Sequence, residues 1–206
     1  VARLSDESSH AYEAFLWLGS ASNLGGMEEF QKLQRYGLAT FYLSTSVDLD
    51  WKVSNGWKSD DHECSWFGIV CADGKAVSEI NLPSNRMSGT IPPEIALAGV
   101  GNKINRIDIS GNNIRGNIPK EIKNLNHLQT LDLRANDFTG EIPSEIGQLT
   151  TLKSLQLEAN ELEGVMPEEI CLLKESNLSV LIADCDSELP FSKVTCEVNT
   201  CCTECY

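Results

Sequence analysis

The sequence predicts an α/β solenoid, in which short strands stack side by side and each copy of a repeated segment adds one layer. Two observations lead to this fold class. A segment of about 24 residues recurs four times with the same apolar spacing, and periods of this length are typical of solenoid proteins. The middle of the repeated part has no cysteine: two cysteines lie before the repeats and six lie in the C-terminal quarter of the chain. We therefore expect a repetitive middle with a cap at each end.

The four copies begin at Val77, Ile104, Leu128 and Leu152, so that successive starts are 27, 24 and 24 residues apart. Each copy follows the pattern L-x-x-L-x-L-x-x-N-x-L-x-G-x-I-P, with exchanges among Leu, Ile, Val, Met and Phe. A fifth start at Leu178 keeps only the first apolar positions. A terminal repeat is expected to lose the pattern because no further repeat stacks on it.

Each repeated position has a physical task. In the third copy, Leu131 and Leu133 point into the core while Thr130, Asp132 and Arg134 point outwards, because side chains alternate along a strand. A ladder of asparagines follows the strands, where buried amides can pair with backbone groups that would otherwise lack partners. The ladder consists of Asn85, Asn112, Asn136 and Asn160. The glycine and the proline of each copy predict extended segments and short helical turns on the convex side.

The phrase L-x-G-x-I-P resembles the plant-type subclass of leucine-rich repeats, found in receptor-like kinase and receptor-like protein ectodomains and in polygalacturonase-inhibiting proteins. The stretch WKSDDHECSWFGIVC, residues 57–71, is similar to the N-terminal cap of that subclass, and the match lies in Trp57, Cys64, Trp66, Gly68 and Cys71. The resemblance implies a right-handed superhelix with a parallel concave β-sheet. Residues 34–51 resemble the helical lead-in of leucine-rich-repeat proteins from diatoms and related algae.

The N-terminal region is predicted to be helical. Apolar residues recur at helical spacing in SSHAYEAFLWLGS, and Phe30, Leu33, Gly37 and Phe41 mark one face of a second helix. We expect these helices to cover the open edge of the first repeat. The predicted regions are a helical N-terminal region and cysteine-containing cap at 1–75, four repeats at 76–176, and a degenerate fifth repeat with a cysteine-rich cap at 177–206.

The eight cysteines favour an oxidising compartment and a disulfide at each of them. Cys64 and Cys71 are the expected partners in the N-terminal cap. The other six allow 15 connectivities, between which the sequence does not choose. They are Cys171, Cys185, Cys196, Cys201, Cys202 and Cys205. A zinc site is the weaker alternative because no histidine lies near this cluster. We predict no metal and no cofactor.

Charge and motifs exclude several function classes. The net charge of −14 is spread through the chain, which makes nucleic acid and anionic lipid poor partners. No apolar run is long enough to cross a bilayer, and the start VARLSD is expected of a processed or trimmed product. His10, His62 and His127 form no recognisable catalytic motif. We therefore predict that the protein is not an enzyme.

The outward strand positions predict a binding face, with a merely hydrated sheet as the alternative. The predicted ligand-binding residues are Glu79, Asn81, Arg106, Asp108, Ser110, Thr130, Asp132, Arg134, Ser154, Gln156, Glu158 and Ile182. We expect that the fold does not depend on these side chains and that they bind a protein or a cell-wall glycan. The alternative function is a constitutive structural subunit of a larger assembly, with contacts through the helical lead-in. Asn177 begins a glycosylation sequon, and the expected location is extracellular or another oxidising lumen.

Overall fold

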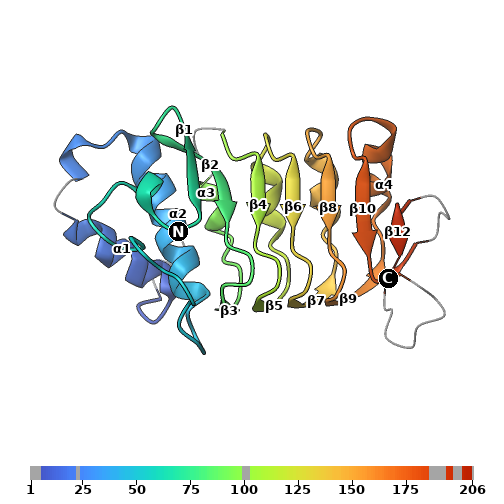
Figure 1. Cartoon of the computed structure of the whole chain (residues 1–206), viewed down its shortest axis with the longest axis horizontal. Coiled ribbons are helices and arrows are strands. Elements are labelled where there is room, and N and C mark those ends of the chain that lie inside the picture. The colour runs from blue at the N-terminus through green and yellow to red at the C-terminus, as the bar shows by residue number, and fades with distance from the viewer. Residues whose placement is uncertain (1–5, 22–23, 99–102, 186–193, 197–200, 206) are drawn as a thin grey trace.

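The computed structural model describes residues 6–21, 24–98, 103–185, 194–196 and 201–205. These residues form a solenoid in which two sheets and the short helices between them enclose one apolar core, with helices at one end and a disulfide-linked cap at the other (Figure 1). The predicted fold class, an α/β solenoid with a helical N-terminal region and a disulfide-rich C-terminal cap, is confirmed.

The larger sheet, which we call the concave sheet, takes one strand from each repeat. Its strands, in spatial order, are β1 (Ile69–Ala72), β2 (Ala76–Asn81), β4 (Arg106–Asp108), β6 (Thr130–Asp132), β8 (Ser154–Gln156), β10 (Val180–Ala183) and β12 (Glu204–Cys205). The pair β1 and β2 is antiparallel, and every later pair is parallel. Equivalent residues of successive repeats lie directly opposite each other, as the common spacing predicts.

The smaller sheet, which we call the second sheet, takes the strand that follows the concave strand in each repeat. Its strands are β3 (Ser88–Gly89), β5 (Asn113–Gly116), β7 (Asp137–Glu141), β9 (Glu161–Val165) and β11 (Val194–Thr195). Short helices then lead back to the concave sheet: α3 (Ile95–Ala98), α4 (Glu168–Leu172), and the 3₁₀ turns η4 (Lys120–Asn124), η5 (Ser144–Gln148) and η6 (Leu173–Glu175). The repeat glycines in the second sheet have positive φ, which side chains rarely adopt.

The core consists of the apolar repeat positions stacked layer on layer. Ile80, Ile107, Leu131, Leu155 and Leu181 follow one another along the concave sheet, and each is almost fully buried. Burial of side chains of this size contributes about 1.5–3 kcal/mol each. This repeated burial is what the leucine spacing of the sequence encodes.

The N-terminal cap is built from α1 (His10–Ser20), α2 (Glu29–Ser44) and the 3₁₀ turns η2 (Leu24–Gly26) and η3 (Glu63–Ser65). The Ser9 side chain accepts a hydrogen bond from the amide of Tyr12 and so begins α1. Gly37 lets α2 approach α3, because a Cβ there would lie 2.6 Å from the carbonyl oxygen of Glu94.

The predicted buried face of α2 is partly wrong. Gly37 and Phe41 are buried as expected, but Leu33 is 42% exposed, and Gln34 and Arg35 are buried in its place. These polar side chains hold the cap loops: Gln34 accepts from the amide of Val77 at 2.8 Å. Arg35 donates to backbone carbonyl groups of the loop that precedes η3, and its guanidinium lies 5.5 and 5.4 Å from the ring centroids of Trp17 and Trp66. Hydrogen bonding therefore acts together with the burial of Leu38 and Phe41 in setting which face turns inwards.

Disulfides close both caps. Cys64 and Cys71 form the expected bridge in the N-terminal cap. In the C-terminal cap, Cys171 of α4 is bonded to Cys201. A further bridge joins Cys185, which follows β10, to Cys205 of β12.

The expectation of a bridge at every cysteine is corrected for Cys196 and Cys202, which are thiols in the structure. Their sulfurs lie within 4.8 Å of each other but are not joined. None of the helices in the described part of the chain combines the length and apolarity of a membrane span.

Candidate functional site: the concave face

Strand register places the predicted binding residues in rows across the concave sheet. One row contains Glu79, Arg106, Thr130, Ser154 and Val180, and the next contains Asn81, Asp108, Asp132, Gln156 and Ile182. The strands are parallel and unshifted from β2 to β10, so side chains of one row are neighbours in adjacent repeats. The third predicted row follows at the strand ends, where Ser110, Arg134 and Glu158 lie in successive repeats.

A first polar cluster surrounds the Asp108 carboxylate. Its Oδ2 accepts from Nη2 of Arg106 at 2.8 Å. Its Oδ1 accepts from the hydroxyl of Ser110 at 2.8 Å and from the amide of Ser110 at 3.2 Å. These bonds hold the carboxylate below the surface of the face and leave the Arg106 side chain 38% exposed above it.

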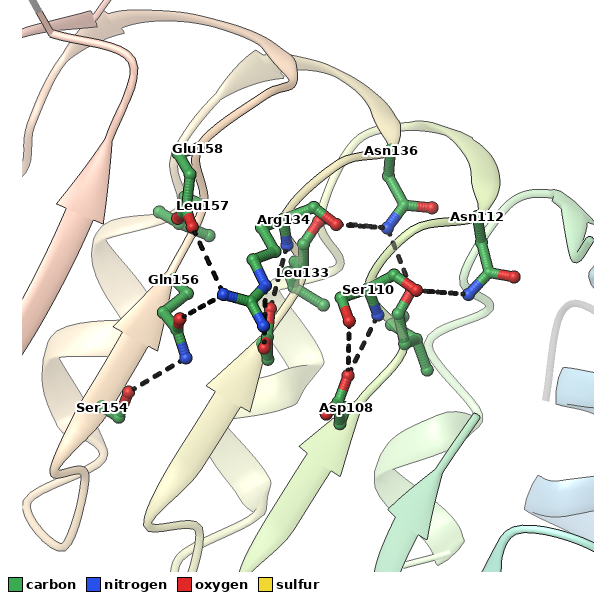
Figure 2. Close-up of polar contacts among 12 residues, drawn as sticks. Asp108, Ser110, Asn112, Leu133, Arg134, Asn136, Ser154, Gln156, Leu157 and Glu158 are labelled. Atoms are coloured by element: carbon green, nitrogen blue, oxygen red, sulfur yellow. Dashed lines mark hydrogen bonds and ion pairs between the residues drawn. The ribbon is translucent and has the colours of Figure 1, made fainter. Parts of the chain in front are cut away.

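A second cluster is centred on Arg134, whose guanidinium bridges two repeats (Figure 2). Its Nε lies 3.3 Å from Oδ2 of Asp132, and its Nη1 donates to Oε1 of Gln156 at 3.2 Å. The same Nη1 lies 3.9 Å from Oε1 of Glu158. Gln156 in turn donates to the hydroxyl of Ser154. Arg134 is fixed from below while its side chain is 48% exposed to solvent.

Burial gives this face unusual proton affinities. Desolvation and the neighbouring charge of Asp108 raise the pKa of Asp132 to about 6, although Arg134 acts in the opposite direction. Desolvation also raises the pKa of Glu158, whose Oε2 is buried with no hydrogen-bond partner among the described residues. The carboxylates of Asp132 and Glu158 are therefore easier to protonate than exposed ones.

The structure corrects the expectation that the fold does not depend on the outward side chains. Asp108, Ser110 and Asp132 are buried and make internal hydrogen bonds. Asn81 and Arg134 are exposed, and the other predicted positions are half-buried. Fewer side chains of the face are therefore accessible than predicted. Those of Arg106 and Arg134 project from it into solvent.

Two residues of the rows, Val180 and Ile182, are apolar, and they lie on β10 beside the C-terminal cap. Ile182 is opposite Glu204 of β12, so the sheet continues past it. The next residue of the third row, Asp184, has a structural role that the sequence pattern did not reveal. Its carboxylate accepts from the amides of Ala159 and Asn160 at 2.8 and 2.9 Å. Its side chain thus satisfies amides at the last described rung of the ladder.

The asparagine ladder forms behind the strand ends as predicted. Nδ2 of Asn136 donates to the carbonyl groups of Ile109, Leu133 and Arg134, and its Oδ1 accepts from the amide of Ile114. Asn112 and Asn160 donate in the same manner, each to the preceding repeat and to its own. The ladder fixes the spacing between the strands that carry the polar rows.

Asn177, the glycosylation candidate, is exposed and its Nδ2 donates to the carbonyl oxygen of Thr150 at 2.8 Å. Glycosylation there stays a prediction. The three histidines lie on separate elements: His10 begins α1, His62 caps η3, and His127 precedes β6. None of them belongs to the rows of the concave face.

Comparison with known proteins places these features in a family. The profile described as Leucine Rich Repeat matches residues 103–125 and 127–149. The leucine-rich repeat receptor-like protein kinase PEPR1 of Arabidopsis thaliana is 43% identical over 47 residues, which are 21% of this chain and 4% of that protein. The ectodomain of the receptor kinase GASSHO1/SCHENGEN3 from the same plant, solved in complex with CASPARIAN STRIP INTEGRITY FACTOR 2, matches with a TM-score of 0.65 at 30% identity. The chain carries leucine-rich repeats of the plant type.

The leucine-rich-repeat protein covers only part of these relatives. The match to the GASSHO1/SCHENGEN3 ectodomain takes in 75% of this chain and 18% of that one. A match to the BIR3–SERK2 complex of Arabidopsis thaliana, with a TM-score of 0.55 and 27% identity, takes in 71% of this chain and 82% of that one. The chain therefore spans a small fraction of the curated relative and most of the matched chain of the BIR3–SERK2 complex.

Proposed function

We propose that this leucine-rich-repeat protein is a non-enzymatic recognition module that binds a protein or peptide through its concave sheet, in an extracellular or other oxidising compartment. The observation that carries the proposal is the pair Arg106 and Arg134, each held by a buried carboxylate so that its guanidinium faces outwards. Holding an arginine in place before binding reduces the entropy lost when a partner arrives. Arginine is also enriched among residues that dominate interface energetics.

The described contacts of Arg134 use Nε and Nη1, and that of Arg106 uses Nη2. A guanidinium has five N–H donors, so each arginine retains donors for a partner. We expect the partner to present carbonyl or carboxylate oxygens above these two positions. An extended peptide fits this requirement because its backbone offers carbonyl groups along its length.

The comparisons support a protein partner. The GASSHO1/SCHENGEN3 ectodomain was solved with CASPARIAN STRIP INTEGRITY FACTOR 2, and BIR3 was solved with SERK2. The glycan that the sequence also suggested has no such support. The six bridged cysteines agree with an oxidising compartment.

Alanine substitution tests this proposal. Proteins captured from the extracellular fraction of the source organism would be titrated against the wild type and against Arg134→Ala. Removal of a central interface arginine is expected to weaken binding about tenfold or more. Arg115→Ala is the matched control, because Arg115 is exposed and lies on the second sheet, in β5. Equal affinities of the wild type and Arg134→Ala, with loss on Arg115→Ala, would contradict the proposal.

A second candidate, a constitutive subunit of a larger assembly, is favoured by a specific observation on α1. Phe15 and Leu16 are 51% and 54% exposed on the outer helix of the N-terminal cap. Contiguous exposed apolar side chains mark surfaces that contact another protein. The native mass in gently extracted material separates the two candidates, because a subunit co-elutes in fixed proportion with its partners, whereas a free module elutes near 22.7 kDa.

A further inference from the structure

Four cysteine sulfurs gather at the C-terminal end of the solenoid. The Sγ atoms of Cys185, Cys196, Cys202 and Cys205 all lie within 4.8 Å of one another. Cys185 and Cys205 are joined to each other, whereas Cys196 and Cys202 are half-buried thiols. A disulfide forms when two sulfurs approach to about 2.05 Å, so a small movement separates this pair from a bond.

The position of the two thiols gives such a bond a structural meaning. Cys196 directly follows β11, the last described strand of the second sheet. Cys202 lies just before β12, the last described strand of the concave sheet. A bond between them would connect the ends of the two sheets at the last described layer of the solenoid. Terminal layers of a solenoid have neighbours on one side only, which makes them the part that gains most from a cross-link.

The two thiols are chemically different. Hydrogen bonding with the Cys202 thiol is the largest cause that lowers the pKa of Cys196 to about 7; burial opposes it, and the Cys202 amide and the charge of Lys174 lower the pKa further. The same hydrogen bond is the main reason that the pKa of Cys202 is raised. Cys196 is therefore the thiolate near neutral pH, and thiolates are the nucleophiles in disulfide exchange.

We propose that Cys196 and Cys202 are a reversible redox pair, in which Cys196 attacks a small disulfide such as oxidised glutathione and Cys202 completes a fourth protein disulfide. In the first step the Cys196 thiolate bonds to one glutathione sulfur and the other leaves as thiolate. In the second step Cys202 loses its proton and attacks Sγ of Cys196, which releases the second glutathione thiolate. The protein loses two electrons and two protons, and two molecules of reduced glutathione form.

The order of attack follows from the hydrogen bond. Once Cys196 is in a mixed disulfide it carries no negative charge, so the main cause of the raised pKa of Cys202 disappears. Cys202 can then deprotonate and act as the resolving thiol. A structural zinc site is disfavoured, because the Cys185–Cys205 bond leaves the cluster two thiols and such a site uses four ligands.

The test uses the purified full chain, equilibrated with oxidised and reduced glutathione in varied ratio, quenched with acid and mapped by alkylation and peptide mass spectrometry. Cys196 and Cys202 are expected to be alkylated together in reducing buffer, and to be recovered as one linked peptide in oxidising buffer. The other three bridges should stay intact over the same range. Thiols that remain alkylatable in oxidised glutathione, or a linkage of either thiol to Cys185 or Cys205, would overturn the proposal.

Two single variants test the order of attack. Cys202→Ser is expected to accumulate glutathione on Cys196, because the resolving thiol is missing. Cys196→Ser is expected to react at Cys202 at least about tenfold more slowly, because this variant lacks the low-pKa thiol. Equal rates for the two variants would contradict the assigned roles. Mapping of the wild type remains decisive if either variant folds poorly.

Discussion

Asp132 shows how one side chain can serve the fold and the binding face together. It is 2% exposed, yet it is held under Arg134 and thereby sets the position of the most exposed cation of the rows. A buried carboxylate of this kind is costly to ionise when only one cation lies near it and other acids, Asp108 and Glu158, surround it. Protonation of Asp132 therefore makes the free energy of unfolding depend on pH.

The sign of that connection follows from the pKa. In the folded chain the pKa of Asp132 is about 6, above its ordinary value of 3.8. Between these values the folded state keeps the proton that the unfolded state has lost, so the contribution of Asp132 to stability falls as pH rises through this window. The loss is on the order of 2–3 kcal/mol. In urea unfolding, the free energy of unfolding is expected to decrease less between pH 4 and pH 8 for Asp132→Asn than for the wild type.

Asp137→Asn is the control for this measurement, because Asp137 is an exposed aspartate on β7. Its pH profile is expected to follow the wild type. If Asp132→Asn and the wild type lose stability equally over this range, the account of a buried, easily protonated carboxylate is wrong.

The asparagine ladder provides a second prediction for a single residue. Asn136→Ala removes the partner of the Ile114 amide and leaves the carbonyl groups of Ile109 and Leu133 with one donor fewer. Leaving buried backbone groups unpaired costs about 2–4 kcal/mol in free energy of unfolding. Chemical denaturation measures the loss. Asn113→Ala, at an exposed asparagine of β5, should change stability by less than about 0.5 kcal/mol.

Sequence periodicity predicted the ladder but not the buried carboxylates. Asn112 and Asn136 recur at a fixed place in each copy, so a common structural reason for them could be inferred. Asp108 and Asp132 sit at outward positions of short strands, and alternation alone predicts solvent exposure there. They are buried because a long arginine side chain lies over each of them, and this depends on side-chain conformation, which periodicity does not encode.

At the scale of elements, the join between the N-terminal cap and the first repeat depends on close backbone contact. The amides of Ser88 and Thr90, either side of Gly89, donate to the carbonyl groups of Thr45 and Ser44 at the end of α2. Gly89 has φ of +116°, and a Cβ there would collide with the carbonyl oxygen of Ser44. The glycine of the first copy therefore serves the cap as well as the repeat.

Gly89→Ala is expected to lower the free energy of unfolding by more than about 3 kcal/mol, because the backbone collides and the φ angle is unfavourable. Gly74→Ala is the matched control, since Gly74 also has a positive φ, +66°, but a Cβ at this position would meet nothing within 4 Å. Its cost should be about 1–2 kcal/mol from backbone conformation alone. Thermal unfolding of the two variants measures the difference, and equal losses would show that the collision is absent.

The helices of the cap were predicted in number and place but not in orientation. The second helix was expected to bury Leu33, whereas it buries Gln34 and Arg35. Apolar periodicity cannot reveal this arrangement, because the partners of these side chains, such as the amide of Val77, lie about 25 residues or more away in sequence. The region boundaries at residues 75 and 176 likewise stay predictions.

At the scale of the whole molecule, the solenoid places equivalent residues of successive repeats in regular rows on one surface. Each repeat contacts only its neighbours, so the caps decide whether the terminal layers hold. The cysteine positions predicted a cap at each end, but the pairing of Cys171 with Cys201 and of Cys185 with Cys205 required the fold. The ligand could not be predicted at all, because the repeat pattern specifies the inward residues and leaves the outward ones unconstrained.

The central claim is that the concave sheet is the surface that meets the partner, and site-specific photo-cross-linking tests it most directly. A photoreactive amino acid would replace Thr130, half-buried on β6 of the concave sheet, or Thr139, half-buried on β7 of the second sheet. Each protein would be irradiated in the extracellular fraction of the source organism. The account predicts a defined protein or peptide adduct from position 130 and none from position 139. Adducts from position 139 alone would contradict it.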